Sequence, residues 1–385
     1  MHHTVFPVGR FDSLRTPFYY YDTALLGQTL DAIGQATAGH NNFHVHYAIK
    51  ANANPDILRQ IAAAGFGADC VSGGEVEAAL FAGFPAAGIV FAGVGKADWE
   101  INLALDAGIA CFNVESLPEL EVINELARKK GLVARVAFRV NPNVDAHTHE
   151  KITTGLNENK FGIAIEDVVP AIRKAQTLPN VDYTGLHFHI GSQILDLTVF
   201  EHLCKRIVEI QDMLVKGGIS TQTINVGGGL GIDYDTPDAN PIPDFSNYFG
   251  IFAKHLPLGP QQTLHFELGR SVVAQCGTLI ARTLYVKQGH AKQFVIVDAG
   301  FTELVRPAMY GSKHDIQNLS SKADNPTATY DVVGPICESS DVFAKGIALP
   351  ATHRGDFIAF RSAGAYGEVM ASQYNCRQLP PSYID

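Results

Sequence analysis

The sequence of 385 residues lacks three features that would each indicate a particular class of protein. It contains no run of about 20 consecutive apolar residues, so it predicts no membrane-spanning helix. It has no long basic run, and its net charge of −10 argues against nucleic acid as a partner. The first residues, Met1 to Thr4, do not combine a basic start with an apolar stretch, so we expect no secretion signal.

Cysteine is scarce and scattered. The chain has no Cys-x-x-Cys pair and no zinc-like spacing, which gives no reason to expect a disulfide framework or a metal site. Free thiols in a reducing cytoplasm are the simplest interpretation, and most of the cysteines are expected to be small core residues. The six are Cys70, Cys111, Cys204, Cys276, Cys337 and Cys376.

Apolar strand-like segments alternate with amphipathic helical segments from about residue 40 to residue 270. This alternation predicts parallel β/α units, and eight units over roughly 230 residues favour a closed (β/α)8 barrel, with a doubly wound open sheet as the alternative. The predicted strands are 44–49, 67–71, 89–92, 110–114, 134–140, 183–190, 223–226 and 263–267. The predicted helices include 56–64, 75–82, 99–107 and 197–216, and a further helix opens at Ser116.

The positions of the polar residues decide in favour of the barrel. Lys50 follows the first strand, Asp69 lies near the end of the second, and His189 ends the sixth. A glycine run follows the seventh strand, and Glu267 ends the eighth. In such barrels active sites lie at the carboxyl ends of the strands, and phosphate often binds after strands seven and eight.

The pattern changes after Arg270. Segments 271–287, 293–298, 329–333 and 356–361 are rich in Val, Ile, Thr and Phe, which is typical of a β domain. The early run 16–22 also reads as a strand, and we expect it to join this C-terminal β domain. The predicted domains are therefore a barrel over 24–269 and a β domain formed by 1–23 and 270–385. A chain of this length is too long for one typical core.

Lys50 is the first candidate for chemistry. A lysine after an apolar strand is often only a solvated end residue. Here Ala48 and Ala51 leave room beside it, and an amine at the mouth of a barrel can form an imine with an aldehyde cofactor. Partial desolvation or nearby positive charge would help keep the amine neutral and nucleophilic.

Two histidines, His187 and His189, lie two residues apart on one predicted strand, so they are expected to face the same side. They could be metal ligands, but no acidic residue stands beside them at ligand spacing. One of the two could equally be a core residue with its hydrogen bonds satisfied. We favour His189, nearer the strand end, as a flat ring that stacks on a pyridine. Ser192 follows on a loop, where its hydroxyl can reach a phosphate oxygen.

The glycine run Gly227, Gly228 and Gly229 allows positive φ angles and close backbone approach, so several N–H groups can converge on a phosphate. A tight structural turn is the alternative.

Glu267 and Arg270 could form a structural salt bridge. If Glu267 instead contacts a pyridine nitrogen, it would keep that nitrogen protonated and the ring electron-withdrawing. Together these residues supply the parts needed to hold pyridoxal 5′-phosphate.

Four motifs make the chain similar to the alanine-racemase-type pyridoxal-phosphate decarboxylases. They are residues 47–52 (Tyr-Ala-Ile-Lys-Ala-Asn), 187–193 (His-Phe-His-Ile-Gly-Ser-Gln), 227–231 (Gly-Gly-Gly-Leu-Gly) and 267–270 (Glu-Leu-Gly-Arg). In the second domain, residues 306–310 (Arg-Pro-Ala-Met-Tyr), 334–341 (Gly-Pro-Ile-Cys-Glu-Ser-Ser-Asp) and 364–367 (Gly-Ala-Tyr-Gly) resemble the diaminopimelate decarboxylase family. The resemblance extends from about residue 16 to residue 374.

This resemblance implies a barrel plus a β domain, a homodimer with shared active sites, and a role for each matching residue. Lys50 would carry the cofactor, with Cys337 of the neighbouring subunit as the proton donor. The implied cofactor-binding residues are Lys50, Asp69, His189, Ser192, Gly227, Gly228, Gly229, Glu267, Gly269, Arg270 and Tyr366. The implied substrate-binding residues are Arg270, Arg306, Tyr310, Glu338 and Tyr366. Without its flanking motif, Cys337 would be interpreted as a small buried residue.

The expected activity is decarboxylation of meso-2,6-diaminopimelate to L-lysine and CO2 in the cytoplasm, the last step of lysine biosynthesis. Arg306 suits the distal carboxylate of this substrate and Glu338 its distal ammonium group. The alternatives are a sister decarboxylase acting on carboxynorspermidine or another basic amino acid, a racemase with the same barrel, and a non-catalytic pyridoxal-phosphate carrier. A carrier would not need the substrate residues of the β domain.

Overall fold

The computed structural model describes residues 6–144, 160–321 and 326–385. The chain divides into two compact units. The barrel unit comprises Leu30–Gly231 and Asp244–Gly269, and the β unit comprises Met1–Thr29, Ile232–Pro243 and Arg270–Asp385. No helix within the described ranges is long and apolar enough to cross a membrane.

The barrel unit is built on a closed ring of parallel strands in sequence order, with the last strand paired to the first. Each strand overlaps a predicted one, so the prediction of a (β/α)8 barrel is confirmed, although the sixth strand ends at His187 and not at residue 190 as predicted. They are β2 (Phe43–Ala48), β3 (Gly67–Cys70), β4 (Ile89–Phe91), β5 (Cys111–Val114), β6 (Ala134–Arg139), β7 (Val181–His187), β8 (Thr223–Asn225) and β9 (Thr263–Leu268).

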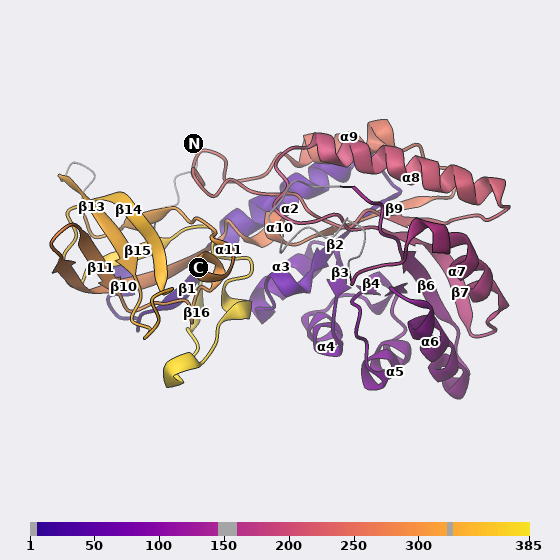
Figure 1. Cartoon of the computed structure of the whole chain (residues 1–385), viewed down its shortest axis with the longest axis horizontal. Coiled ribbons are helices and arrows are strands. Elements are labelled where there is room, and N and C mark those ends of the chain that lie inside the picture. Colours follow the sequence, from indigo (N-terminus) through magenta and orange to yellow (C-terminus); the bar gives the residue numbers. More distant parts are fainter. Residues whose placement is uncertain (1–5, 145–159, 322–325) are drawn as a thin grey trace. The chain divides into compact units, whose positions relative to one another are not determined.

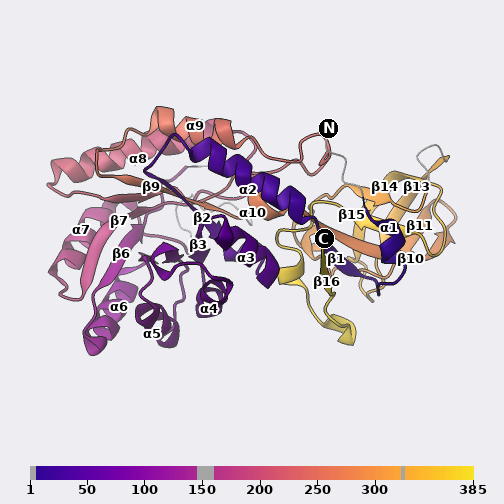
Figure 2. The same cartoon turned by 180° about the vertical axis from the view of Figure 1, so that it is seen from behind.

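Helices cover the outside of this ring (Figure 1). Each turns an apolar stripe toward the strands, as α8 does with Leu203, Ile207 and Leu214. Helices α8 and α9 lie side by side in both views (Figures 1 and 2). The helices of the barrel unit are α3 (Pro55–Ala63), α4 (Gly73–Ala82), α5 (Asp98–Ala107), α6 (Leu117–Lys130), α7 (Ile165–Thr177), α8 (Thr198–Lys216) and α9 (Phe245–His255). Helix α2 (Thr23–Thr37) runs from the β unit into the barrel unit.

The β unit contains a mixed sheet in the order β12-β15-β10-β11-β13-β14. The predicted N-terminal strand is present as β1 (Phe18–Tyr21), which pairs with β10 and with the last strand, β16 (Ser382–Ile384). Phe11, at the end of helix α1 (Val8–Phe11), packs edge-on against Phe18 of β1 and Phe357 of the sheet. The other strands are β10 (Gly277–Gln288), β11 (Gln293–Val297), β12 (Ile316–Asn318), β13 (Thr327–Val333), β14 (Val342–Pro350) and β15 (Phe357–Phe360).

Several details of the β unit differ from the sequence prediction, which did not include the short strands β12 and β16. The segment predicted as a strand from residue 271 begins as a helical turn, α10 (Arg270–Val273), and strand β10 starts only at Gly277. Strand β14 was not predicted, because Lys345 and Gly346 interrupt its apolar pattern. Its pairing with β13 shifts register there, and Gly346 has a positive φ of 64°. A bulge of this kind removes the two-residue periodicity that identifies a strand.

Candidate active site

Lys50 lies at the carboxyl end of the barrel strands, in the short 3-10 turn η1 (Ile49–Ala51) that follows β2. Its Nζ atom is 3.8 Å from Oδ2 of Asp69, whose side chain on β3 is 1% exposed. Burial raises the pKa of Asp69 well above its usual range, the Glu267 carboxylate adds to the rise, and Lys50 offsets only part of it. The structure therefore places a carboxyl group with a raised pKa beside the amine.

Glu267 is a buried carboxylate surrounded by hydrogen-bond donors. Its Oε1 atom accepts hydrogen bonds from Nδ2 of Asn225 at 2.7 Å and Nδ2 of Asn113 at 3.3 Å. Its Oε2 atom is 2.9 Å from Nε2 of His187. Burial alone would raise the pKa of Glu267, but His187 and Lys50 outweigh it and hold this pKa well below the usual range. Glu267 is therefore ionised and can only accept hydrogen bonds.

The two histidines of the predicted motif have different surroundings. His187 is 1% exposed and uses Nε2 to contact Glu267. His189 lies beyond the end of β7, and its Nδ1 atom accepts the Gly228 N–H at 3.3 Å. Desolvation, then the charges of Lys50 and Arg139, hold the pKa of His189 well below its usual range. His189 is therefore a neutral ring, and it remains our candidate for stacking on a cofactor.

The glycine turn after β8 has the close approach that a phosphate cradle needs. A Cβ atom at Gly228 would lie 1.9 Å from the carbonyl oxygen of Glu267, and one at Gly227 would lie 2.3 Å from that of Phe188. No larger residue fits this path without moving the backbone. The Ile194 N–H donates to the carbonyl of Gly229 at 2.9 Å, which ties the turn to the loop that carries Ser192.

Gly269 lies beside Ala48 and Ala51, which are close to Lys50 in the sequence. A Cβ atom there would be 3.2 Å from Cβ of Ala48 and 3.0 Å from Cβ of Ala51, so the three small residues leave the lysine side chain its space. The barrel unit thus offers an amine, a neutral flat ring, an ionised carboxylate and a glycine-rich backbone turn. This donor set fits pyridoxal 5′-phosphate. Among the described residues, no group of three or more His, Cys, Asp or Glu side chains could hold a metal ion.

The β unit contains a second set of predicted residues, centred on two buried arginines. Arg270 at the start of α10 is 4% exposed and donates from Nη1 to the Tyr234 hydroxyl at 2.7 Å. Arg306 at the start of α11 (Arg306–Tyr310) is 6% exposed and donates from Nη2 to Oγ of Ser312 at 3.1 Å.

Aromatic rings surround both guanidinium groups. The Arg270 group lies 4.9 Å from the Tyr366 ring, and the Arg306 group lies 5.8 Å from the same ring and 5.5 Å from that of Tyr310. Within the described ranges, Arg306 forms no salt bridge, and its buried Nε atom has no hydrogen-bond partner. A buried cation without a carboxylate partner suits an anionic ligand.

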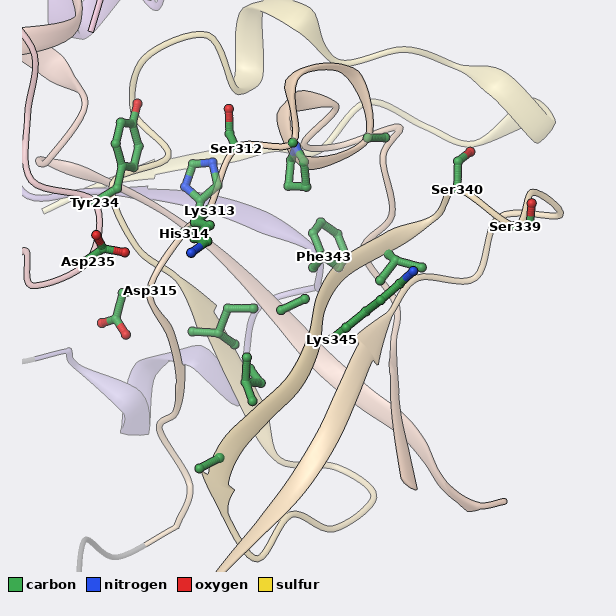
Figure 3. Close-up of a pocket in the computed structure, with 18 residues that line it drawn as sticks. Tyr234, Asp235, Ser312, Lys313, His314, Asp315, Ser339, Ser340, Phe343 and Lys345 are labelled. Atoms are coloured by element: carbon green, nitrogen blue, oxygen red, sulfur yellow. The ribbon is translucent and has the colours of Figure 1, made fainter. Parts of the chain in front are cut away.

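Tyr234 was not predicted from the sequence, although it lies only a few residues beyond the glycine run. With Ser312 and His314 it lines one part of a cavity of about 720 Å³ in the β unit, and Ser339, Ser340 and Lys345 line another part (Figure 3). The Tyr234 and His314 rings meet edge to face at 5.2 Å. Asn113 and Asn225 were also missed. Both are polar residues on short, buried barrel strands, which is the signal that could have revealed them.

Cys337 and Glu338 are exposed, so the structure contradicts the alternative of a buried Cys337. They lie on the loop between β13 and β14, which Asp341 holds by accepting the Ile336 N–H at 2.8 Å and the Phe301 N–H at 2.7 Å. The Tyr374 hydroxyl donates to Oε1 of Glu338 at 2.7 Å. All six cysteines are free thiols.

Comparison with known proteins adds independent findings. Residues 28–274 match the family described as the pyridoxal-dependent decarboxylase, pyridoxal binding domain. A diaminopimelate decarboxylase of Bacteroides thetaiotaomicron is 61% identical over 98% of this chain and 98% of its own length. One from Zymomonas mobilis is 42% identical over 94% of this chain and 86% of its own. The crystal structure of diaminopimelate decarboxylase from Helicobacter pylori complexed with L-lysine is similar with a TM-score of 0.92, at 40% identity, covering 98% of this chain and 93% of that one.

The environment of Asp69 predicts a pH-dependent effect on stability. Because folding raises its pKa, the fold favours the protonated acid, and this contribution is present below the unfolded pKa of about 3.9 and lost as pH rises through the folded value. Asp69→Asn should therefore raise the melting temperature of the cofactor-free protein at pH 8, with a smaller gain near pH 4. Calorimetry across this pH range measures the gain, and Asp182→Asn at an exposed position is the control. If the gain in melting temperature became smaller as pH rises, the conclusion that burial disfavours the charged form of Asp69 would be wrong.

Proposed function

The chain belongs to the diaminopimelate decarboxylase family of pyridoxal-dependent decarboxylases, and we propose on that premise that it converts meso-2,6-diaminopimelate into L-lysine and CO2. The observation that carries the proposal is the ionised, buried Glu267 carboxylate at the end of β9, in a barrel whose first strand leads directly into Lys50. The close relatives over nearly the full length of the chain support the choice of substrate.

The residues of the barrel unit would hold pyridoxal 5′-phosphate. When bound, this cofactor supplies an electron-withdrawing ring that accepts the electron pair left behind by CO2. We assign Lys50 as the residue that holds the aldehyde carbon, Glu267 as the partner of a protonated ring nitrogen, and His189 as the stacked ring. We assign Ser192, Gly227, Gly228, Gly229 and Arg270 to the phosphate. We assign Gly269, Asp69 and Tyr366 to the cofactor site without a phosphate contact.

Asp69 has a role in the proton balance of Lys50. An ammonium group is not nucleophilic, so Lys50 has to lose a proton from Nζ before it can bind an aldehyde. The Asp69 carboxyl is 3.8 Å away, and its raised pKa makes it a good acceptor for that proton. After the chemical step the same carboxyl can return the proton. We therefore assign Asp69 to proton storage beside the amine.

The arginine cluster of the β unit supports the choice of a substrate with a distal carboxylate. Arg306 is a buried cation that can pair with this carboxylate in a low-dielectric setting, and Tyr310 and Tyr366 close the sides of the site. Glu338 supplies a negative charge for the distal ammonium. A decarboxylase for a simple diamine precursor would have no use for Arg306.

We further propose that Cys337 protonates the α-carbon in the active site of a partner subunit. Its exposure on the loop between β13 and β14 supports this, because a thiol that serves another subunit has to stand at the surface. The protein would then be a homodimer with shared sites, in which a β domain of residues 1–23 and 270–385 completes a barrel of residues 24–269.

We also propose a cytoplasmic location, which the free thiols support, and the absence of a nucleic-acid partner, which the net charge of −10 supports.

The proposed activity is tested by product analysis. The wild-type protein with pyridoxal 5′-phosphate should release CO2 and L-lysine from meso-diaminopimelate and should act poorly on carboxynorspermidine. Lys50→Ala should lower turnover by about a thousandfold or more, because no other amine holds the cofactor. Lys129→Ala, on the exposed face of α6, is the matched control and should retain turnover. Normal turnover in Lys50→Ala would refute the assignment, and a preference for carboxynorspermidine would identify the sister decarboxylase.

The shared active site is tested by mixing two inactive variants. Lys50→Ala and Cys337→Ala subunits, unfolded and refolded together, form hybrids in which one of the two sites contains both intact residues. Random pairing makes half of the dimers hybrids, so roughly a quarter of wild-type activity should return. If each site is built within one subunit, the mixture should be no more active than the two variants measured separately.

A further inference from the structure

Asn225, the last residue of β8, contacts two parts of the cofactor site with one side chain. Its amide nitrogen donates to Oε1 of Glu267 at 2.7 Å, and its amide oxygen accepts the Gly227 N–H at 2.9 Å. The side chain is 2% exposed, so both bonds lie out of water. A single planar amide therefore connects the carboxylate proposed for the ring nitrogen to the turn proposed for the phosphate.

Backbone contacts complete this connection. The Glu267 N–H donates to the carbonyl of Gly227 at 2.8 Å, and a Cβ atom at Gly228 would lie 1.9 Å from the carbonyl oxygen of Glu267. The Gly228 N–H in turn donates to Nδ1 of His189 at 3.3 Å. The turn cannot move relative to β9 without breaking these bonds. The carboxylate, the turn and the imidazole thus form one hydrogen-bonded unit.

Asn113 provides an internal comparison. It is 1% exposed on β5 and donates to the same oxygen of Glu267, but at 3.3 Å, and it makes no hydrogen bond to the glycine turn. His187 occupies the other oxygen of Glu267 from β7. Asn113, Asn225 and His187 all help to compensate the buried charge of Glu267. Of these three, Asn225 is the one whose second hydrogen bond reaches the turn.

We propose that Asn225 is a positioning residue that fixes the Glu267 carboxylate and the glycine turn at one separation, so that both ends of pyridoxal 5′-phosphate are bound together. The inference rests on the proposed function, because it concerns the cofactor of that reaction. Its consequence is a coupling between ring binding and phosphate binding. In the wild-type protein the Glu267 carboxylate and the glycine turn are held at a separation that matches the cofactor. Both contacts can then form without rearrangement of the protein, so the phosphate group strengthens cofactor binding as far as its contacts allow.

The test compares two ligands on cofactor-free protein. Pyridoxal 5′-phosphate engages both ends of the site, whereas pyridoxal lacks the phosphate. Asn225→Ala should weaken binding of pyridoxal 5′-phosphate by about tenfold to a hundredfold, since it removes a hydrogen bond to a charged group and frees the turn. It should weaken pyridoxal binding less, so that the affinity ratio of the two ligands falls. Absorbance titration at equilibrium measures both constants.

Asn113→Ala is the matched control, because it removes a buried amide from the same carboxylate oxygen without touching the turn. It should weaken both ligands by a similar factor and leave the affinity ratio close to the wild-type value. Asn225→Leu keeps the side-chain volume and removes both hydrogen bonds, so it should lower the ratio as Asn225→Ala does. An unchanged ratio in either Asn225 variant, or the same fall in Asn113→Ala, would overturn the proposal.

Thermal unfolding of the cofactor-free proteins separates positioning from folding. The Asn225 variants should unfold as cooperatively as Asn113→Ala. If both Asn225 variants fail to fold while Asn113→Ala folds, Asn225 is a structural residue and the proposal falls. The proposed function has its own test, because wild-type protein that shows the expected ligand ratio but releases no CO2 from meso-diaminopimelate would overturn the function and leave the role of Asn225 intact.

Discussion

The burial of a charged carboxylate at the carboxyl end of the barrel strands is the constraint on which the rest of the site depends. An isolated ion in such a place costs on the order of several kcal/mol, so Glu267 persists as an anion only because donors surround it. Asn113, Asn225 and His187 approach it from three different strands. The barrel closure that brings these strands together is therefore also what makes the charge possible.

A second carboxyl group, Asp69, lies close enough to respond to the first. The pKa of Asp69 is raised by burial and by Glu267, whereas the pKa of Glu267 is lowered. When two acids in one site are driven in opposite directions, they are suited to different tasks. Here one group stays charged and can hold a proton on a ring nitrogen, while the other has a raised pKa and can take up and return a proton of Lys50.

The sequence was sufficient to predict the barrel and its principal residues. The apolar periodicity identified the strands and helices, their alternation indicated parallel β/α units, and polar residues at the ends of the strands indicated the site. Lys50, Asp69 and Glu267 each follow or end an apolar run, and parallel strands bring such ends to one face. His187 and His189 show the limit of this reasoning. Two residues that are separated by one position on a strand face the same side of the sheet. Strand β7 ends at His187, however, so His189 lies beyond the strand and the two rings have different environments.

Contacts made across the barrel could not be predicted in the same way. Asn113 and Asn225 lie far apart in the sequence and belong to no motif with a known spacing, so their meeting at one oxygen depends on strand register. Tyr234 comes from a segment that joins the β unit although barrel residues flank it on both sides. The amino-acid composition of residues 232–243 does not indicate that this segment belongs to the β unit. Strand β14 escaped prediction because a bulge interrupts its alternation.

The most direct measurement of the central claim is nitrogen-15 NMR of the protein loaded with pyridoxal 5′-phosphate labelled at the ring nitrogen. An ionised Glu267 beside that nitrogen predicts the chemical shift of a protonated pyridinium at neutral pH, retained up to about pH 8 because a nearby anion raises the nitrogen pKa. The shift of a neutral pyridine, in protein whose Lys50 is shown to carry the cofactor, would contradict the account.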